Sequence, residues 1–194
     1  DSPRVWAQTL LAISFLPYPQ PQPWINKLVN HYQQHQKRDW HWFENRLNYD
    51  NFRLPLSLLK NFQSSENPQK ILDLALASLD FLTQQFLDSH NNYFNFICDK
   101  NVPSQQPIEA GGAIETYSTA FFITGNKKYY SLAKLAFEWF HGQNIIGKSL
   151  INPKTGGVYD GLEKNGVNFN QGAESILAYL LGAHAFSLCD TIKT

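Results

Sequence analysis

The chain has 194 residues, of which 16% are charged, and its formal net charge is zero. A chain without a basic excess lacks the electrostatic signature of nucleic-acid and anionic-membrane binders, so we expect neither kind of partner. No apolar run approaches the roughly 20 residues needed to cross a bilayer, which predicts a soluble protein, expected in the cytoplasm.

The cysteine and methionine content indicates whether the chain has disulfides and whether it is a piece of a longer protein. Cys98 and Cys189 are too few for a disulfide framework and lack metal-ligand spacing, so we expect ordinary thiols. The chain contains no methionine and begins Asp-Ser-Pro, whereas a translated product normally begins with Met. We therefore expect a processed piece or an excised domain of a longer protein.

Prolines and apolar periodicity organise the first half of the chain. Proline fits the first turn of a helix, where its missing N–H has no acceptor in any case. Apolar residues then recur at steps of three and four, as on one face of a helix. The pattern predicts helices from Pro3 to Leu16, from Pro23 to His35, from about Pro55 to Phe62, and from Pro68 to Phe86.

The second half continues the helical pattern around two polar segments. We expect helices from Ser104 to Thr124, from Asn126 to Phe140, and from Asn170 to about Cys189. Residues 88–104 and 143–169 are expected loops, the second with a short hairpin near Gly156 to Asp160. The whole chain is predicted to be one all-α domain, residues 1–194, of about seven helices.

Residues 39–55 form the chemically densest stretch. Trp40 and Trp42 offer flat apolar faces, while Glu44, Asp50 and Arg53 offer directional hydrogen bonds. A sugar ring has an apolar face that stacks on aromatic rings and a rim of hydroxyls that suits carboxylate, amide and guanidinium partners. The alternative is that the aromatic rings belong to the core and the charges lie in a solvated loop.

Two further dense motifs precede later helices at a similar spacing. Asp50 and Gln106 are 56 residues apart, and Gln106 and Gln171 are 65 apart, which suits a repeating helical hairpin. Alternate helices of such a repeat point the same way, so the motifs are expected to meet at one face. The amide residues of these two motifs are Gln105, Gln106, Asn170 and Gln171, which we predict to bind substrate.

Carboxylates near helix N-termini are the candidate catalytic groups. Glu109 and Glu174 fall near first turns, where the helix dipole favours an anion, although capping alone explains each one. Tyr159 and Asp160 lie on a glycine-rich loop, where Asp160 equally caps a turn. Glycoside hydrolysis needs two carboxyls, and the sequence leaves the pair open among Glu44, Asp50, Glu109, Asp160 and Glu174. Glu44, crowded by aromatic rings, is the expected general acid. No metal site or cofactor motif is present, and none is expected.

Four segments carry a family resemblance that covers nearly the whole chain: residues 42–55, 105–110, 155–161 and 168–175. They resemble a helical domain found in many bacterial glycosyltransferase proteins, where it follows a nucleotide-sugar transferase domain. That domain is similar to six-hairpin α/α-toroid glycosidases and to sugar epimerases. Since seven helices make only part of a six-hairpin toroid, the resemblance implies a C-terminal part of such a domain. The expected partners are the transferase domain or the missing half of the toroid.

Three functions are therefore in competition. The first is a carbohydrate-active toroid domain that binds or cleaves a glycan. The second is a non-catalytic helical domain that positions a transferase, in which the motif side chains are buried and satisfy one another. The third, a sugar epimerase, needs a general base, for example a histidine, in the cleft.

Overall fold

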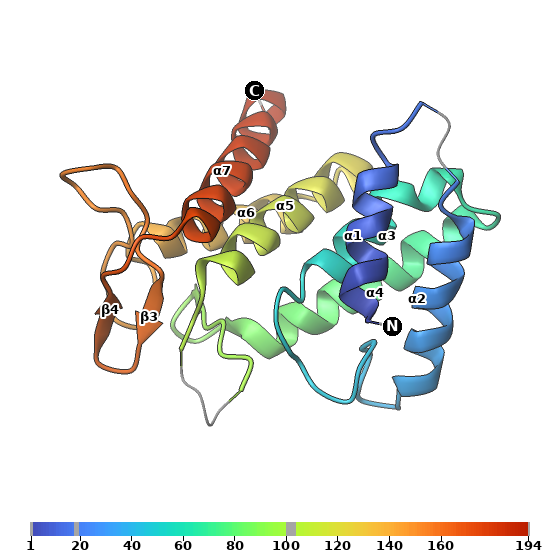
Figure 1. Ribbon diagram of the computed structural model, residues 1–194, viewed down its shortest axis with the longest axis horizontal. Coiled ribbons are helices and arrows are strands. Elements are labelled where there is room, and N and C mark those ends of the chain that lie inside the picture. Colours follow the sequence, from blue (N-terminus) through green and yellow to red (C-terminus); the bar gives the residue numbers. More distant parts are fainter. Residues whose placement is uncertain (1, 18–19, 100–103, 194) are drawn as a thin grey trace. The chain divides into compact units, whose positions relative to one another are not determined.

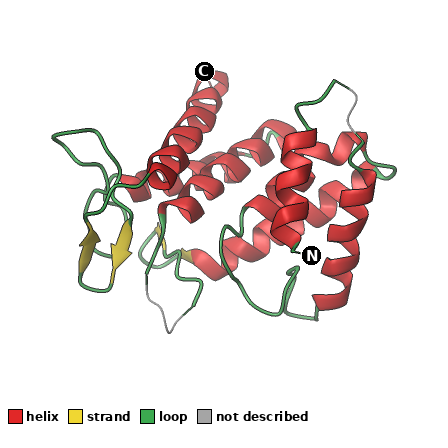
Figure 2. Ribbon diagram, viewed as in Figure 1, coloured by secondary structure: helices red, strands yellow, loops and turns green. Residues whose placement is uncertain are grey.

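The computed structural model describes residues 2–17, 20–99 and 104–193, with side chains to residue 191. The described residues are mostly helical, with seven α-helices and two short hairpins (Figure 2). The predicted all-α class is thus confirmed. The chain divides into two compact units, Asp1–Gln85 and Phe86–Thr194. The prediction of a single domain over residues 1–194 stays a prediction.

The first unit is built from four helices. They are α1 (Pro3–Ile13), α2 (Gln22–His35), α3 (Arg53–Asn61) and α4 (Pro68–Phe86), and a short 3₁₀ turn, Phe62–Ser64, follows α3. Its core contains Leu10, Ile25, Leu28, Phe43 and Leu58, each with no exposed surface. The predicted starts at Pro3 and Pro68 agree with the structure.

Helices α1 and α3 run parallel. Near their N-terminal ends, Arg4 Nη2 donates to Asn51 Oδ1 at 3.3 Å. Near their C-terminal ends, Asn61 Nδ2 donates to the carbonyl oxygen of Leu10 at 3.0 Å. Because residue numbers rise together along the two helices, both begin at the same end of this unit.

The second unit contains three helices and two hairpins (Figure 1). The helices are α5 (Pro107–Thr124), α6 (Lys127–Phe140) and α7 (Ala173–Lys193). Gly125 ends α5 in the left-handed conformation, at φ 66°, and the Asn126 side chain caps α6 by accepting from the Lys128 N–H. The antiparallel hairpins pair β1 (Leu87–Asp88) with β2 (Tyr93–Phe94), and β3 (Gly161–Glu163) with β4 (Gly166–Asn168).

Glycines allow α5 and α7 to pack closely. A Cβ on Gly111 of α5 would lie only 2.4 Å from the carbonyl oxygen of Ala178, and one on Gly182 of α7 would lie 3.0 Å from Ile114 Cδ1. Further along, Cys189 Sγ lies 3.8 Å from the Ser118 carbonyl oxygen. These contacts also rise together in number, so α5 and α7 are parallel and lie side by side (Figure 1).

Several predicted helix boundaries are wrong, and hydrogen bonds account for two of them. Helix α1 ends at Ile13 rather than Leu16, where Ser14 folds back and its hydroxyl donates to the Leu11 carbonyl oxygen at 2.7 Å. Helix α5 begins at Pro107 rather than Ser104, because the Gln105 backbone pairs with Leu162 through two 2.9 Å hydrogen bonds.

The beginnings of α3 and α7 also differ from prediction. Helix α3 begins two residues before Pro55, which still lies in its first turn. Helix α7 begins at Ala173 rather than Asn170, because the Asn170 carbonyl oxygen accepts from the Asp160 N–H at 2.8 Å and the Gly172 N–H donates to the Asp160 side chain.

Near the predicted place of a hairpin, residues 150–152 pair with residues 157–159 around a turn, through an antiparallel bridge between Ile151 and Val158. A longer hairpin that was not predicted lies at residues 161–168, where Leu162 pairs with Val167. The hairpin at residues 87–94 was not predicted.

Replacing Gly111 with Ala should destabilise the fold. The added methyl group meets the α7 backbone rather than a movable side chain, so the helices must separate, at a cost of about 1–3 kcal/mol. Urea denaturation followed by circular dichroism measures the loss. Gly166→Ala is the control, since a Cβ there meets nothing within 4 Å. Equal stabilities of the two variants would contradict the close packing.

Candidate functional site

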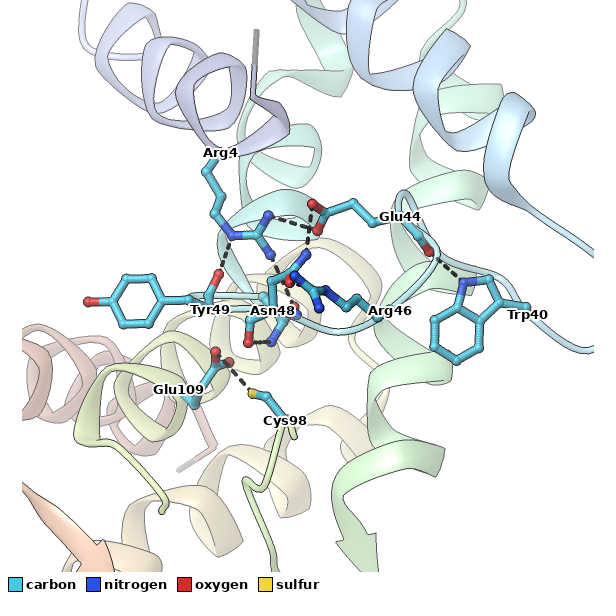
Figure 3. A network of polar contacts seen from close by, with 9 residues as sticks. Arg4, Trp40, Glu44, Arg46, Asn48, Tyr49, Cys98 and Glu109 are labelled. Carbon is cyan, nitrogen blue, oxygen red and sulfur yellow. Dashed lines mark hydrogen bonds and ion pairs between the residues drawn. The ribbon is translucent and has the colours of Figure 1, made fainter. Parts of the chain in front are cut away.

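Glu44 lies at the centre of a polar cluster in the first unit (Figure 3). Its Oε2 is 2.7 Å from Arg4 Nη1 in an ion pair whose side chains are 19% and 18% exposed. Its Oε1 accepts a 3.0 Å hydrogen bond from Asn48 Nδ2. Through these contacts Glu44 connects Arg4 of α1 to Asn48 in the segment before α3. Its role as a general acid stays a prediction.

Arg4 also organises the segment that follows Glu44. Its Nε donates to the Tyr49 carbonyl oxygen, and Asn51 Oδ1, which accepts from its Nη2, also accepts from the Asn48 N–H at 3.2 Å (Figure 3). Asn51 is fully buried. Arg4 was not among the predicted site residues, because its partners lie 40 to 47 residues away along the chain.

Asp50 has the most unusual backbone of the candidate carboxylates. It lies directly before α3 with φ at 51°, a left-handed conformation that Asp tolerates better than most residues. Its side chain is 8% exposed, and its Oδ1 is 3.3 Å from Arg53 Nε in an ion pair. Gln8 Nε2 donates to its Oδ2 at 3.4 Å. Asp50 and Arg53, both predicted site residues, therefore join α1 to the start of α3.

The two predicted tryptophans have different surroundings. Trp42 is fully buried, with its ring 5.2 Å from that of Phe43 and 6.1 Å from that of Phe81. Trp40 is half-buried, and its Nε1 donates to the Glu44 carbonyl oxygen at 2.6 Å (Figure 3). Of the two, only Trp40 offers ring surface to a ligand.

In the second unit, the residues that precede α5 are mostly internal. Gln105 is 2% exposed, and its Oε1 accepts from the Phe96 N–H at 2.9 Å and from Trp139 Nε1 at 3.3 Å. Glu109, in the first turn, is 3% exposed and lies 3.7 Å from Cys98 Sγ (Figure 3). Gln106 is exposed at the N-cap position.

Asp160 caps α7 from a distant part of the chain. Its Oδ1 accepts from the Gly172 N–H at 2.7 Å and from the Ser175 hydroxyl at 2.6 Å. These groups lie at the start of the helix, where N–H groups need outside acceptors. The next residue, Gly161, passes so close to Gln105 that a Cβ would lie 2.6 Å from its carbonyl oxygen. Residues 160–162 thus connect the starts of α5 and α7.

Five residues, four of them exposed, surround the start of α7, and we call them the α7 platform: Tyr159, Phe169, Asn170, Gln171 and Glu174. Phe169 is 71% exposed, and its ring centre lies 5.1 Å from that of the partly buried Tyr159, nearly at right angles. Asn170, Gln171 and Glu174 are exposed. Phe169 was not among the predicted binding residues, although its position within the motif at residues 168–175 was a usable signal.

Gln171 is held in place by the glycine-rich loop. Its Oε1 accepts from the Thr155 hydroxyl at 3.3 Å. A Cβ on Gly157 would lie only 2.0 Å from the same oxygen, so glycine is needed there while Gln171 keeps this position. The Gln171 side chain therefore has a defined position on the platform.

The structure brings the predicted residues together within each unit. Glu109 and Glu174 lie in the first turns of parallel helices, and Asp160 lies beside the start of α7. In the other unit, Glu44 and Asp50 lie in the segment before α3, and both contact α1, which is parallel to α3. Convergence of all five carboxylates on one cleft stays a prediction.

The described residues contain no group of three or more His, Cys, Asp or Glu side chains that is arranged to hold a metal ion. In the same residues, no helix has both the length and the apolar character that crossing a membrane requires.

The chain resembles known proteins in its fold and not in its sequence. No protein-family model matches the chain, and no curated protein matches its sequence. The solved structures it resembles include an inactive variant of the α-1,6-mannanase GH76A of Salegentibacter sp. HEL1_6 in complex with α-1,6-mannotriose. That match has a TM-score of 0.63 at 14% identity, over 98% of this chain and 66% of the mannanase. A family 76 glycoside hydrolase from a bovine Bacteroides thetaiotaomicron strain matches with a TM-score of 0.60 at 16% identity, over 96% of this chain and 46% of the hydrolase.

These matches show the α/α-toroid fold, of which this chain is a part. A GH76 α-mannanase of Bacteroides thetaiotaomicron also matches, with a TM-score of 0.58 at 14% identity, over 98% of this chain and 60% of the mannanase. The chain therefore spans less than two thirds of the length of each of these three enzymes.

Replacing Asp160 with Ala should weaken the start of α7. The variant removes an acceptor that serves Gly172 and Ser175, and loss of such a cap costs about 1–2 kcal/mol. Urea denaturation measures the total, and hydrogen exchange at the Gly172 amide reports the local opening. Glu163→Ala is the control, since Glu163 is exposed and its contact with Ser104 is a long 3.4 Å. Unchanged exchange at Gly172 in Asp160→Ala would contradict the capping role.

His31 should make the first unit less stable in acid. Burial, and then the nearby His35, lower the pKa of His31 below its usual 6.5, while Glu44 opposes them. The unfolded chain then binds the proton more readily, so this group's stabilisation is complete above pH 6.5 and is lost as pH falls through its folded pKa.

Titration of the imidazole by NMR measures the His31 pKa directly. His35→Gln removes one positive neighbour and should move the His31 pKa upward. A His31 pKa above 6.5 in the unmodified chain would contradict this electrostatic account.

Proposed function

We propose that this chain is a carbohydrate-binding part of an α/α-toroid protein. The observation that carries the proposal is the α7 platform, where the exposed Phe169 ring lies beside Tyr159 and next to exposed amide and carboxylate groups. Covering the exposed face of the Phe169 ring with a ligand would remove apolar surface from water, which is favourable. A sugar ring fits, since its apolar face stacks and its hydroxyls bind Asn170, Gln171 and Glu174.

The helix ends beside the platform suit a neutral, hydroxyl-rich ligand. Helices α5 and α7 begin at the same end of the unit, and their N-terminal dipoles balance Glu109 and Glu174. Carboxylates stabilised in this way remain acceptors for sugar hydroxyls. The fold match to mannanases that bind α-1,6-mannotriose supports the same class of ligand.

We propose binding rather than hydrolysis by the mechanism of those mannanases. The inactive Salegentibacter variant carries replacements at two consecutive aspartates. No two acidic residues are adjacent anywhere in the present chain. If the complete toroid cleaves a glycan, Glu44, Asp50, Glu109, Asp160 and Glu174 are the candidates this chain offers, and other groups come from the rest of the toroid.

A structural role beside a glycosyltransferase is the second candidate. It is favoured by the burial of Asn51, Gln105 and Glu109, and by the mutual hydrogen bonding of Arg4, Glu44 and Asn48. These contacts leave the exposed platform unexplained, so we place this role second. A sugar epimerase is not proposed, because the α7 platform contains no histidine to act as the base.

Isothermal titration calorimetry with a panel of neutral oligosaccharides, including α-1,6-mannotriose, tests the binding proposal. Phe169→Ala should weaken binding about tenfold, since burying an aromatic ring is worth roughly 1.5 kcal/mol or more. Phe122→Ala is the matched control, because Phe122 is 43% exposed on α5 and outside the platform. Absence of binding across the panel would overturn the proposal, and equal losses in both variants would remove the platform from it.

A further inference from the structure

Two histidines lie one helical turn apart at the C-terminal end of α2. His31 and His35 are four positions apart, so their side chains lie on the same face of the helix. Their ring centres are 4.3 Å apart, and the ring planes meet at 50°. Both side chains are half-buried, so each keeps some contact with solvent. Neither residue belongs to the polar cluster around Glu44 or to the α7 platform.

Contacts within the first unit hold both rings in place. His35 Nδ1 lies 2.8 Å from the His31 carbonyl oxygen. Because a carbonyl oxygen only accepts hydrogen bonds, Nδ1 carries the proton, and Nε2 of the neutral His35 ring has a lone pair. Metal-binding histidines usually donate their other ring N–H in this way. The His31 ring packs edge-on against Trp6 of α1, with ring centres 5.5 Å apart.

The distance between the rings agrees with two adjacent ligands of one ion. A metal bound in the plane of an imidazole is about 2.1 Å from the nitrogen and about 3.2 Å from the ring centre. Two such ligands at right angles have ring centres about 4.5 Å apart, and two at the tetrahedral angle about 5.2 Å. The observed 4.3 Å is closer to the right-angle arrangement, which Cu²⁺ and Ni²⁺ prefer.

The position of the pair on α2 also favours a cation. His35 is the last residue of the helix. The carbonyl groups of the last turn give a helix a partial negative charge at this end. A divalent ion beside His35 therefore lies where the helix dipole attracts it.

We infer that His31 and His35 bind a divalent transition-metal ion through one ring nitrogen each, with Cu²⁺ as the preferred ion. Imidazole suits Cu²⁺, Ni²⁺ and Zn²⁺, whereas Mg²⁺ and Ca²⁺ prefer oxygen ligands. The described residues offer no third His, Cys, Asp or Glu to the ion, so water completes its coordination and the ion exchanges with solvent. Such a site was not expected from the sequence, because two histidines alone are a weak motif.

Isothermal titration calorimetry with Cu²⁺ tests the site at pH 7.5, where an imidazole is mostly neutral. The parent and every variant carry Cys98→Ser, so that this half-buried thiol does not compete for the ion. His31→Gln and His35→Gln should each weaken binding at least about tenfold, since even the loss of a group that orients a metal ligand costs that much. His184→Gln removes an exposed histidine of α7 and should bind as the parent does.

A second control keeps the number of histidines and changes their spacing. His35→Gln combined with Gln33→His, at an exposed position of α2, places the pair two positions apart. Side chains at that spacing do not face each other on a helix. The double variant should therefore bind Cu²⁺ as weakly as His35→Gln alone. Circular dichroism checks that each variant is folded.

Electron paramagnetic resonance of the bound Cu²⁺ identifies the ligands directly. The parent should show two coordinating nitrogens and His35→Gln one. Absence of saturable binding to the parent, or equal affinities of the parent, His31→Gln and His35→Gln, would overturn the inference. A double variant that binds as tightly as the parent would show binding to separate histidines and would also overturn it.

Discussion

The contact that the second unit depends on most is the connection made by residues 160–162 between the starts of α5 and α7. Asp160 caps α7, and the Leu162 backbone pairs with Gln105 just before α5. Glycine contacts between Gly111, Ala178 and Gly182 then hold the two helices parallel and close. Without this connection, Glu109, Glu174 and the α7 platform would have no fixed relation to one another.

The first unit reaches a similar arrangement with a different device. There an arginine rather than an aspartate links distant segments, since Arg4 of α1 binds Glu44, Tyr49 and Asn51 ahead of α3. Both units therefore place polar motifs at the common end of a parallel helix pair. In both, the buried polar groups maintain the arrangement, because a buried charge or amide without a partner is costly. The exposed Phe169 ring lies outside these buried contacts.

The sequence predicted the helices better than the site, for physical reasons. Helical periodicity and proline are local signals, so the bounds of α4 and the caps at Gly125 and Asn126 were predictable. The starts of α5 and α7 depend on pairing with residues 160–162, which no local pattern reveals. Residue type also does not determine burial. Trp42 and Gln105 are residue types that commonly bind sugars, but here they lie in the core, whereas Phe169, a residue type common in cores, is exposed.

The most direct test of the account is an NMR titration of the ¹⁵N-labelled chain with α-1,6-mannotriose, followed through its backbone amides. The account predicts saturable shifts concentrated at Tyr159, at residues 169–171 and at Glu174, with the amides of Leu180, Leu181 and Leu188, further along α7, unaffected. Saturable shifts confined to other parts of the chain, or none at millimolar sugar, would contradict a carbohydrate site at the start of α7.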